Sequence, residues 1–474
     1  MILEFKSQLS TNPIFDIVSR VAVENGIPTY VVGGYVRDLL LNRICKDIDF
    51  VCVGDGISLA HKVAEALGGI QVVVFQNFGT AMIKNEGFEL EFVGARKESY
   101  RDHSRKPEVQ SGTLEDDQNR RDFTINALAI SLNREDYGIL LDPFNGVGDL
   151  KKKIIRTPLF PDTTFSDDPL RMMRAVRFAA QLNFDIEPET FDSISRNAHR
   201  LKIISAERII DETNKIIRCA VPSYGFKLLF HSKLLHQYFP EMATLQGVEY
   251  VGGNAHKDNF YHTLQVLDNV ARVSDDLWLR WAAIMHDIAK PATKRFDPQN
   301  GFTFHGHEDK GARMTPGIFR RLKLPMGEQM SFVQKLVRLH LRPISLAYEV
   351  TDSAIRRLLF EAGQDIDSLM ILCRADITSK NTEKVNRFLK NFDKVEERMR
   401  QVEAQDHIRN FQPPVSGEEI MDTLGVGPGR IVGVIKESIK DAILEGTIKN
   451  NRAEAWELML KIAAEQGLNP KTIN

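Results

Sequence analysis

Cysteine is scarce in this chain, and the few that occur lie far apart. The four cysteines, with no C-x-x-C pair among 474 residues, are Cys45, Cys52, Cys219 and Cys373. This spacing excludes a disulfide framework and a cysteine-based zinc site, and it is typical of reduced thiols in the cytosol. We therefore expect a cytoplasmic location.

Long apolar runs are also missing. No run reaches the roughly 18 residues that a membrane span needs. Residues 1–6 do not form a basic segment followed by a long apolar core, which is what an export signal requires. We therefore expect neither export nor a membrane partner.

No charge of one sign dominates the chain. The 62 basic and 64 acidic residues give a formal net charge of −2. This balance gives no general indication of nucleic-acid binding, although a local basic surface could still attract RNA. Internal repeats and low-complexity segments are absent as well, and 474 residues are too many for one hydrophobic core, so three or four domains are expected.

The predicted strands are confined to the first third of the chain. Strand-like runs lie at 29–32, 48–53, 71–75, 80–84 and 88–93, with helical patterns at 13–26 and 57–67. From Thr164 onward the pattern is almost wholly helical, with predicted helices at 168–182, 188–196, 205–219 and 222–235. The fold class is therefore predicted as α+β, with a small mixed sheet followed by helical domains. Turn-rich stretches at 142–146, 247–254 and 412–414 are candidate boundaries.

A glycine turn and two acids give the first chemical signal. Gly33 and Gly34 would let backbone N–H groups approach a phosphate closely. Asp47 and Asp49 would point to one face of a strand, where two like charges repel unless a cation lies between them. Mg²⁺, which binds carboxylates and substrate phosphates, fits best. Glu91, which shares a face with Glu89 on a later strand, is our choice for a third ligand; solvated strand acids are the alternative.

Arginines form the second signal. Arg120 and Arg121 could bind triphosphate oxygens as guanidinium forks, or they could lie on a solvated face. Three further arginines that recur every third residue and could contact a triphosphate are Arg171, Arg174 and Arg177. Asp168 and Arg171 share a helix face, where they could present hydrogen-bonding edges to a nucleobase or form an ordinary salt bridge.

These segments together resemble the class II tRNA nucleotidyltransferases, the CCA-adding enzymes, and the related bacterial poly(A) polymerases. The resemblance covers residues 29–212. It implies a polymerase-β-like head that adds C, C and A to tRNA 3′ ends from CTP and ATP, with Asp47 and Asp49 as Mg²⁺ ligands. It also implies nucleotide binding by the glycine turn, by Asp168 with Arg171, and by Arg37, Arg121, Asp122 and Arg174. The polar segment 94–119 resembles the flexible loop of the family, which we expect to be irregular, and Phe78–Ala81 favours the CCA-adding branch.

Histidines suggest a second metal site downstream. Adjacent His286 and Asp287 inside an apolar helix are costly to bury unless they are paired or metal-bound. The order of histidines and acids resembles the HD phosphohydrolase domain, which implies as ligands of a divalent transition metal His262, His286, Asp287 and Asp376. His307 and His340 could hold a second metal or a phosphate. The sequence does not choose the metal, and a purely structural helical domain is the alternative.

A glycine-rich turn near the C-terminus enters a predicted helix. Gly427, Gly429 and Arg430 would suit an RNA phosphate at this point, which agrees with a tail that binds the tRNA elbow; an ordinary helix–helix turn is the alternative. The expected domains are a nucleotidyltransferase head (1–160), a neck that binds the nucleobase and RNA (161–235), an HD domain (236–385) and a tRNA-binding tail (386–474).

Three functions remain open at this point. The leading one is CCA addition to the acceptor end of tRNA, with hydrolysis of phosphoesters by the HD domain as a side activity. A poly(A) polymerase or an A-adding enzyme is the alternative in the same class. In a different class, the chain is an HD phosphohydrolase whose head only binds RNA. The oligomeric state is not indicated.

Overall fold

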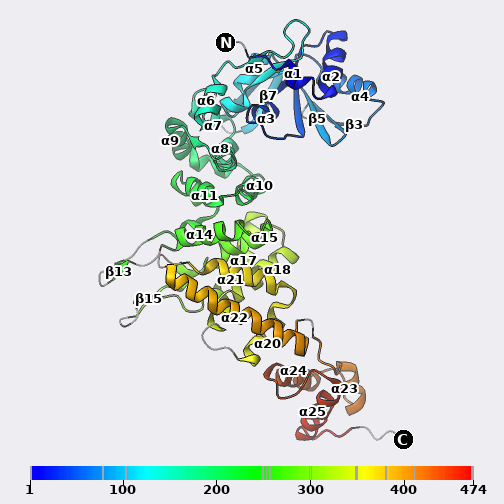
Figure 1. Ribbon diagram of the computed structural model, residues 1–474, viewed down its shortest axis with the longest axis vertical. Coiled ribbons are helices and arrows are strands. Elements are labelled where there is room, and N and C mark those ends of the chain that lie inside the picture. Colours follow the sequence, from blue (N-terminus) through cyan, green and yellow to red (C-terminus); the bar gives the residue numbers. More distant parts are fainter. Residues whose placement is uncertain are drawn as a thin grey trace. The chain divides into compact units, whose positions relative to one another are not determined.

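A computed structural model describes residues 3–76, 79–101, 104–247, 250–251, 254–255, 258–297, 299, 301–346, 351–378, 382–409 and 411–470. The chain divides into two compact units, Met1–Pro240 and Glu241–Asn474. The first unit holds a mixed sheet and a set of helices, whereas helices dominate the described part of the second (Figure 1). The predicted α+β class is confirmed.

The N-terminal unit contains one large sheet. Its strands follow the order β3-β4-β5-β2-β1-β8-β9, and only β2 and β5 are parallel within it. The strands of this unit are β1 (Thr29–Val32), β2 (Asp47–Cys52), β3 (Val72–Phe75), β4 (Thr80–Asn85), β5 (Phe88–Gly94), β6 (Arg96–Arg101), β7 (Ser104–Ser111), β8 (Ala129–Ser131), β9 (Leu140–Leu141), β10 (Ile154–Ile155) and β11 (Asp185–Ile186).

Helices of the same unit cover the sheet and then form the neck. Those of the head are α1 (Lys6–Leu9), α2 (Pro13–Glu24), α3 (Gly34–Leu40), α4 (Gly56–Ala66), α5 (Leu114–Asn119), the 3₁₀ turn η2 (Thr124–Asn126) and α6 (Gly146–Lys152). Those of the neck are α7 (Pro161–Asp167), α8 (Leu170–Leu182), α9 (Pro188–Asn197), the 3₁₀ turn η3 (Ala198–Ile203), α10 (Ala206–Ile217), α11 (Pro222–His231) and α12 (Leu234–Tyr238).

Alternation along β2 sorts its side chains onto two faces of the sheet. Phe50 is fully buried and stacks on Phe92, its register partner on β5, with ring centroids 4.8 Å apart. Phe15 of α2 packs edge-on against Phe50, so apolar burial fixes the register of this face. Asp47 and Asp49 are consequently directed to the opposite face.

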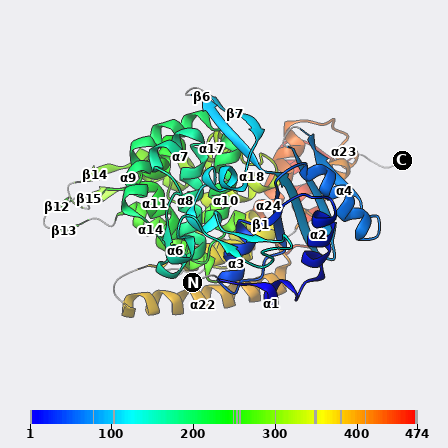
Figure 2. The same ribbon diagram turned by 90° about the horizontal axis from the view of Figure 1, so that it is seen from above.

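Two expectations for this unit are wrong in detail. The described residues of segment 94–119 are not irregular: β6 and β7 form an antiparallel hairpin (Figure 2). Helix α5 follows, and Thr113 and Asp116 form its capping box. The predicted helix 222–235 is two helices, because the chain leaves the helical conformation at Lys233, whose φ is +63°. Polar composition alone does not reveal the cross-strand pairing of a hairpin.

The C-terminal unit is built from helices with short hairpins. Its elements are α13 (Pro240–Ala243, at the unit boundary), β12 (Tyr250–Val251), β13 (Asn254–Ala255), α14 (Asn259–Ala271), α15 (Leu277–Met285), α16 (Lys290–Thr293), β14 (Arg295–Asp297), β15 (Gly301–Thr303), α17 (His307–Leu322), α18 (Glu328–Leu339), α19 (Arg342–Leu346), α20 (Asp352–Ala362), the 3₁₀ turn η4 (Gly363–Asp365), α21 (Ile366–Asp376), α22 (Thr382–Asp406), α23 (Gly417–Leu424), α24 (Arg430–Glu445) and α25 (Arg452–Glu465). Among the described residues no helix is long and apolar enough to cross a membrane.

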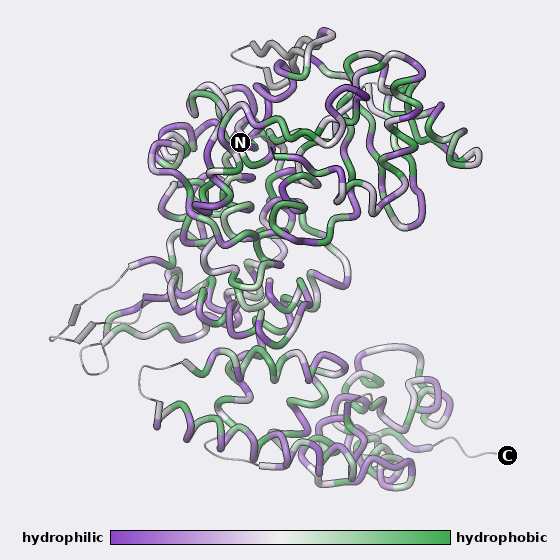
Figure 3. The backbone as a smooth tube through the Cα atoms, turned by 45° about the horizontal axis from the view of Figure 1, so that its top comes forward, coloured by the Kyte–Doolittle hydropathy of each residue, from purple (hydrophilic) through white to green (hydrophobic). Residues whose placement is uncertain are grey.

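Helix α22 illustrates how the helices of this unit are held. Its buried side chains are Phe392, Val395, Met399 and Val402, which recur three or four residues apart. This spacing places them on one face, and the remaining positions are mostly polar, so the colours alternate along the helix (Figure 3). The apolar face packs on α19 and α20.

Candidate functional site

Three carboxylates share one face of the head sheet, on the neighbouring strands β2 and β5. In the parallel register of β2 and β5, Asp49 lies opposite Glu91 and Asp47 lies opposite Glu89. Glu89 is bound by Lys84, with Nζ 2.5 Å from Oε1. Because its neighbour is already paired with a cation, Glu91 is the better candidate for the third ligand beside the two aspartates.

The charges of these acids act on one another. Burial raises the pKa of Asp49, Arg121 opposes this rise, and the charge of Asp47 adds to it. Partial burial and then the charge of Asp49 raise the pKa of Glu91. A set of hard oxygen ligands that repel one another fits a divalent cation such as Mg²⁺.

The glycine turn lies against this acidic site. Gly33 has φ +71°, which disfavours any residue with a side chain. A Cβ atom at Gly33 would lie 2.9 Å from Nη1 of Arg121 and 3.4 Å from Oδ2 of Asp49. The turn, the acid and the arginine therefore meet at one point, and Gly34 begins α3 there.

Asp117 holds the predicted arginine pair. Its carboxylate is fully buried in α5, where Oδ1 accepts a hydrogen bond from Arg120 and Oδ2 accepts one from Arg121 at 2.9 Å. The two arginines keep the pKa of Asp117 below its usual range despite burial. Sequence reasoning missed Asp117, although its spacing of three and four residues from the arginines is that of helical ion pairs.

A second network joins the head to the neck. Arg37 donates to the side-chain oxygen of Asn126 at 2.8 Å, and Asn126 in turn donates to Asp122 at 3.0 Å. Arg174 of α8 completes the chain with a 2.7 Å bond to Asp122. Asp122 is buried, but Arg174 and Asn126 outweigh this burial and lower its pKa to about 2. Asn126 was not among the predicted site residues.

The aromatic ring of Phe178 lies near the guanidinium groups of three arginines. The guanidinium carbons of Arg37, Arg174 and Arg177 lie 5.0, 5.4 and 3.8 Å from the centre of its ring. Such distances allow cation–π attraction. Phe178 was also missed, since a phenylalanine on an apolar helix face gives no sign of such a role in a sequence.

Asp168 and Arg171 do not form the simple salt bridge that their spacing allows. Oδ2 of Asp168 lies 3.5 Å from Nη2 of Arg208, and its Oδ1 accepts from the backbone N–H of Leu170 at 3.1 Å. Arg171 donates to the backbone oxygen of Arg120 at 2.6 Å. The guanidinium of Arg171 is thereby fixed beside the arginine pair of the head.

Arg177 has a more buried environment than the other two arginines of the stripe. Its side chain is buried between α8 and α10, where Nε donates to Glu212 at 2.5 Å and Nη1 donates to Gln181 at 3.0 Å. Burial lowers the pKa of Arg177, and Glu212 opposes that change. A three-residue spacing on a helix also rotates the stripe, so its last member, Arg177, faces the protein interior. A contact of Arg177 with a triphosphate stays a prediction.

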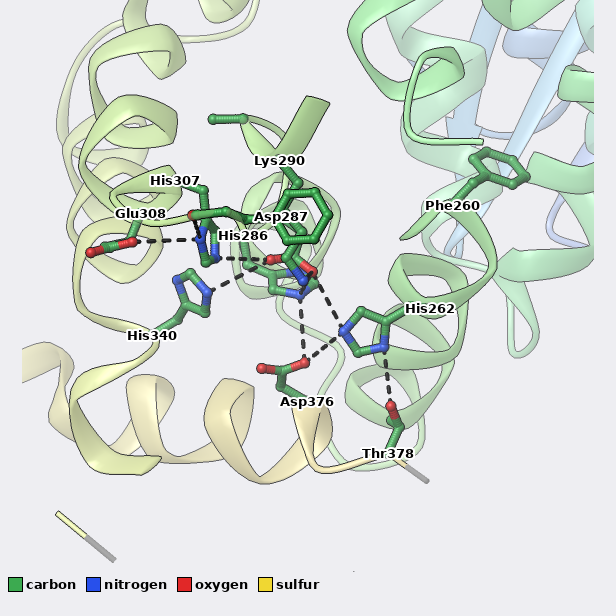
Figure 4. Close-up of polar contacts among 12 residues, drawn as sticks. Phe260, His262, His286, Asp287, Lys290, His307, Glu308, His340, Asp376 and Thr378 are labelled. Carbon is green, nitrogen blue, oxygen red and sulfur yellow. Dashed lines mark hydrogen bonds and ion pairs between the residues drawn. The ribbon is translucent and has the colours of Figure 1, made fainter. Parts of the chain in front are cut away.

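The histidines and acids predicted in the second unit come together in one buried cluster (Figure 4). Nε2 of His262 lies 2.8 Å from Oδ1 of Asp376, and Nε2 of His286 lies 3.6 Å from the same oxygen. These three residues form one group that could hold a metal ion, and Asp287, His307 and His340 form another. The six residues come from α14, α17, α21 and the turns that end α15 and α18.

Burial and neighbouring charges shift the pKa values of the cluster residues in different directions. Burial disfavours protonation of His286, but Asp287 and Asp376 outweigh it and raise its pKa to about 10. Burial and the neighbouring His286 lower the pKa of His340 to about 4. Although buried, Asp287 has its pKa held well below the usual range by His286 and Lys290. The carboxylates thus stay ionised and attract positive charge into the site.

The tail turn has the predicted backbone. Gly425 ends α23 in the left-handed conformation, and Arg430 begins α24 after Gly429. Ser416 and Glu419 form the capping box that starts α23. Whether Gly427, Gly429 and Arg430 contact RNA stays a prediction. The prediction drawn from Phe78–Ala81 falls partly on Phe78, which is outside the described residues.

Comparison with family models identifies three known domains along the chain. Residues 29–156 match the poly A polymerase head domain, 183–245 the probable RNA and SrmB-binding site of polymerase A, and 259–381 the HD domain. This order of parts defines a nucleotidyltransferase of the poly(A) polymerase type with an HD domain. In such proteins the head and the HD domain typically use divalent metals.

Relatives that align over most of this chain show to which nucleotidyltransferases it is similar. The A-adding tRNA nucleotidyltransferase of Deinococcus radiodurans is 31% identical over 431 residues, which cover 88% of this chain and 92% of the relative. The multifunctional CCA protein of Shewanella frigidimarina is 31% identical over 369 residues, which cover 74% and 84%. A solved tRNA nucleotidyltransferase, complexed with a primer tRNA and an incoming ATP analog, is 26% identical with a TM-score of 0.56 and covers 80% of this chain and 99% of its own. The chain belongs to the tRNA nucleotidyltransferase family.

Proposed function

We propose that this chain adds C, C and A to the 3′ end of tRNA from CTP and ATP and releases pyrophosphate. The observation that carries the proposal is the meeting of Asp49, Arg121 and the Gly33 turn at one point of the head sheet, with Glu91 opposite Asp49 on the neighbouring strand. Asp47, Asp49 and Glu91 would hold Mg²⁺. When bound, the metal would activate the attacking 3′-hydroxyl and neutralise the triphosphate.

The residues around the acids have separate tasks in this proposal. Backbone N–H groups of the turn at Gly33 and Gly34 approach the phosphates. Arg121 and Arg120, fixed by Asp117, bind triphosphate oxygens. Asp168 and Arg171 present acceptor and donor edges to the incoming base, in the way a template base would. Arg174 orients Asp122 and, through Asn126, Arg37.

Addition of A alone is the second candidate. It is favoured by the name of the Deinococcus radiodurans relative, whereas the Shewanella frigidimarina relative is named a CCA protein. The two functions differ in their use of CTP. Incubation of the chain with tRNA that lacks CCA and, in parallel, with tRNA that ends in CC tests the proposal, with CTP and ATP supplied separately and together. Incorporation of C from CTP alone supports CCA addition, and incorporation of A only onto tRNA that already ends in CC contradicts it.

A phosphoesterase activity of the HD domain is a further proposed function. The buried cluster of four histidines and two aspartates supports it, since such ligands suit a divalent transition metal. Replacement of Asp47 and Asp49 by alanine separates the two activities: nucleotide addition should vanish while hydrolysis of phosphoesters persists. If no nucleotide addition occurs in the parent protein and hydrolysis is the sole activity, the chain is a phosphohydrolase with an RNA-binding head.

The division into head (1–160), neck (161–235), HD domain (236–385) and tail (386–474) is part of this proposal. In it the tail binds the tRNA elbow through the turn at Gly427, Gly429 and Arg430. Arg430→Glu tests the contact: the KM for tRNA should rise several-fold while the KM for CTP and ATP stays constant. An unchanged KM for tRNA would show that the tail turn does not contribute to tRNA binding.

A further inference from the structure

A short hairpin separates α16 from α17 in the C-terminal unit. Its strands β14 and β15 are antiparallel, with Phe296 opposite Phe302 and Arg295 opposite Thr303. In Figure 1 and in Figure 2 the hairpin projects from the helices of its unit. None of the described residues between 294 and 306 is buried, so the side chains of the hairpin are open to contacts with a partner.

One face of the hairpin carries a pair of aromatic rings. Phe296 and Phe302 are register partners, so their side chains point to the same face. Their rings meet edge to face, with centroids 5.3 Å apart and planes at 67°. Phe296 remains 55% exposed, and Phe302 is partly exposed. A flat apolar ring surface is thereby presented to solvent.

Positive charge lies beside these rings. Nζ of Lys294 is 4.3 Å from the centre of the Phe302 ring, which is within the range of cation–π attraction. Arg295 is exposed, and among the described residues no ion pair holds its guanidinium. Asp297 is the one acid that the sequence contains between residues 290 and 306. The hairpin therefore combines exposed ring faces with an excess of positive charge.

We infer that the β14–β15 hairpin is a binding site for single-stranded RNA. A nucleobase stacks on the exposed ring of Phe296, and a phosphate beside that base lies against the ammonium group of Lys294. Rings and cations in alternation suit a strand in which bases and phosphates alternate, and stacking accepts any base because every base has a π-face. A duplex fits less well, since its bases are stacked on one another inside the helix.

RNA is favoured over an acidic peptide as the occupant of the hairpin. A peptide carboxylate would satisfy the cations and leave the ring faces unused, and the chain belongs to the tRNA nucleotidyltransferase family. The surface consists of residues outside the acidic site of the head, the histidine cluster and the tail turn. The inference requires neither nucleotide addition nor phosphoester hydrolysis, so its test is independent of both.

Photo-crosslinking on the full-length chain tests the inference. The probe is an unstructured RNA of about ten nucleotides that contains 4-thiouridine, and no CTP, ATP or added metal is present. After irradiation and digestion, mass spectrometry locates the cross-linked residues. Besides any cross-links in the head, neck or tail, we expect cross-links at Phe296 or Phe302, and their yield should fall as the salt concentration rises. Absence of cross-links between residues 294 and 304 would overturn the inference.

Single variants separate stacking from other contacts. The RNA concentration that gives half of the maximal hairpin cross-link should rise by about fivefold or more in Phe296→Leu and in Lys294→Ala, and it should stay near the parent value in Phe296→Trp. Thr303→Val, next to Phe302 and on the opposite face of β15, is the matched control and should match the parent.

Two results from these variants would overturn the inference. One is an equal rise in Thr303→Val and Phe296→Leu, which would indicate a loss of hairpin structure and not of stacking. The other is an altered sedimentation coefficient of Phe296→Leu with unchanged RNA cross-linking, which would indicate a protein contact at this face. If a variant unfolds by circular dichroism, the position of the cross-links in the parent still decides.

Discussion

Asp49 and Glu91 are register partners on the parallel strands β2 and β5. Sequence spacing pairs Asp47 with Asp49, but it does not show which later acid reaches them. We chose Glu91 from its place in the strand, and the pairing of Glu89 with Lys84 supports that proposal.

The two glutamates of β5 therefore offer a matched comparison. Glu91→Gln should lower the rate of nucleotide addition by about 10- to 100-fold, since it removes a proposed metal ligand. Glu89→Gln changes an acid on the same face of the same strand and should leave the rate within about threefold. The measurement is single-turnover addition of CMP at saturating Mg²⁺. Equal losses in both variants would show that β5 contributes only general negative charge.

Asp117 should act on nucleotide binding through the arginines that it holds. Asp117→Asn weakens two charge-assisted bonds, so we expect the KM for CTP and ATP to rise by about tenfold while the KM for tRNA changes little. Asp117→Glu should restore part of the loss. The control is Asp116→Asn, which changes the neighbouring acid of α5, whose side chain forms the capping box with Thr113. A fall in protein stability without a change in KM would make Asp117 merely structural.

Arg171 and Arg177 should differ in the property that each controls. Arg171→Lys loses the planar fork that we propose for contact with the incoming base, and incorporation of UMP and GMP should increase relative to CMP and AMP. Arg177→Lys weakens the buried pair with Glu212, so it should lower the melting temperature and leave nucleotide choice unchanged. Misincorporation and thermal unfolding, measured on both variants, separate these roles. Altered selectivity in Arg177→Lys would restore Arg177 to the nucleotide site.

Asp122 should stabilise the protein in a pH-dependent way. Its pKa is about 2 in the folded chain and about 3.9 in an unfolded one. A lowered pKa means that the ionised form stabilises the fold, so the contribution is complete above about pH 4 and disappears as the pH falls toward 2. Asp122→Asn should therefore cost about 2 kcal/mol at pH 6, and the difference from the parent should shrink below pH 4.

Denaturant midpoints of the parent and the Asp122→Asn variant at pH 6 and pH 3 provide this measurement. Asp211→Asn is the control, because its pair with Lys215 is exposed and should contribute less than about 0.5 kcal/mol at either pH. A difference between the parent and Asp122→Asn that is the same at both pH values would contradict the assignment.

Much of the head, of its acidic site and of the histidine cluster could be predicted from the sequence, because the patterns that indicate them involve residues close together in the chain. Alternation on β2 placed Asp47 and Asp49 on one face, and His286 with Asp287 inside an apolar helix indicated a buried polar site. Such features depend on a few neighbouring residues.

The rest depends on contacts between distant segments. The bond between Asp122 and Arg174 and the contacts of the two Asp287 oxygens with different histidines follow from tertiary packing. Arg177 shows the same limit, since helical spacing places it in a stripe and only the position of α10 places it in the interior. Local sequence patterns therefore indicated the residue types of each site, whereas the contact partners of those residues became known only from the fold.

The most direct test of the central claim is the sequence of the tRNA end that the protein produces. The full-length chain is incubated with Mg²⁺, CTP, ATP and a tRNA that lacks its last three nucleotides, and the product is analysed by mass spectrometry. The account predicts one product, extended by C, C and A, and no extension by the Asp47→Ala/Asp49→Ala variant. Long A tails without C, or no extension by the parent, would contradict it.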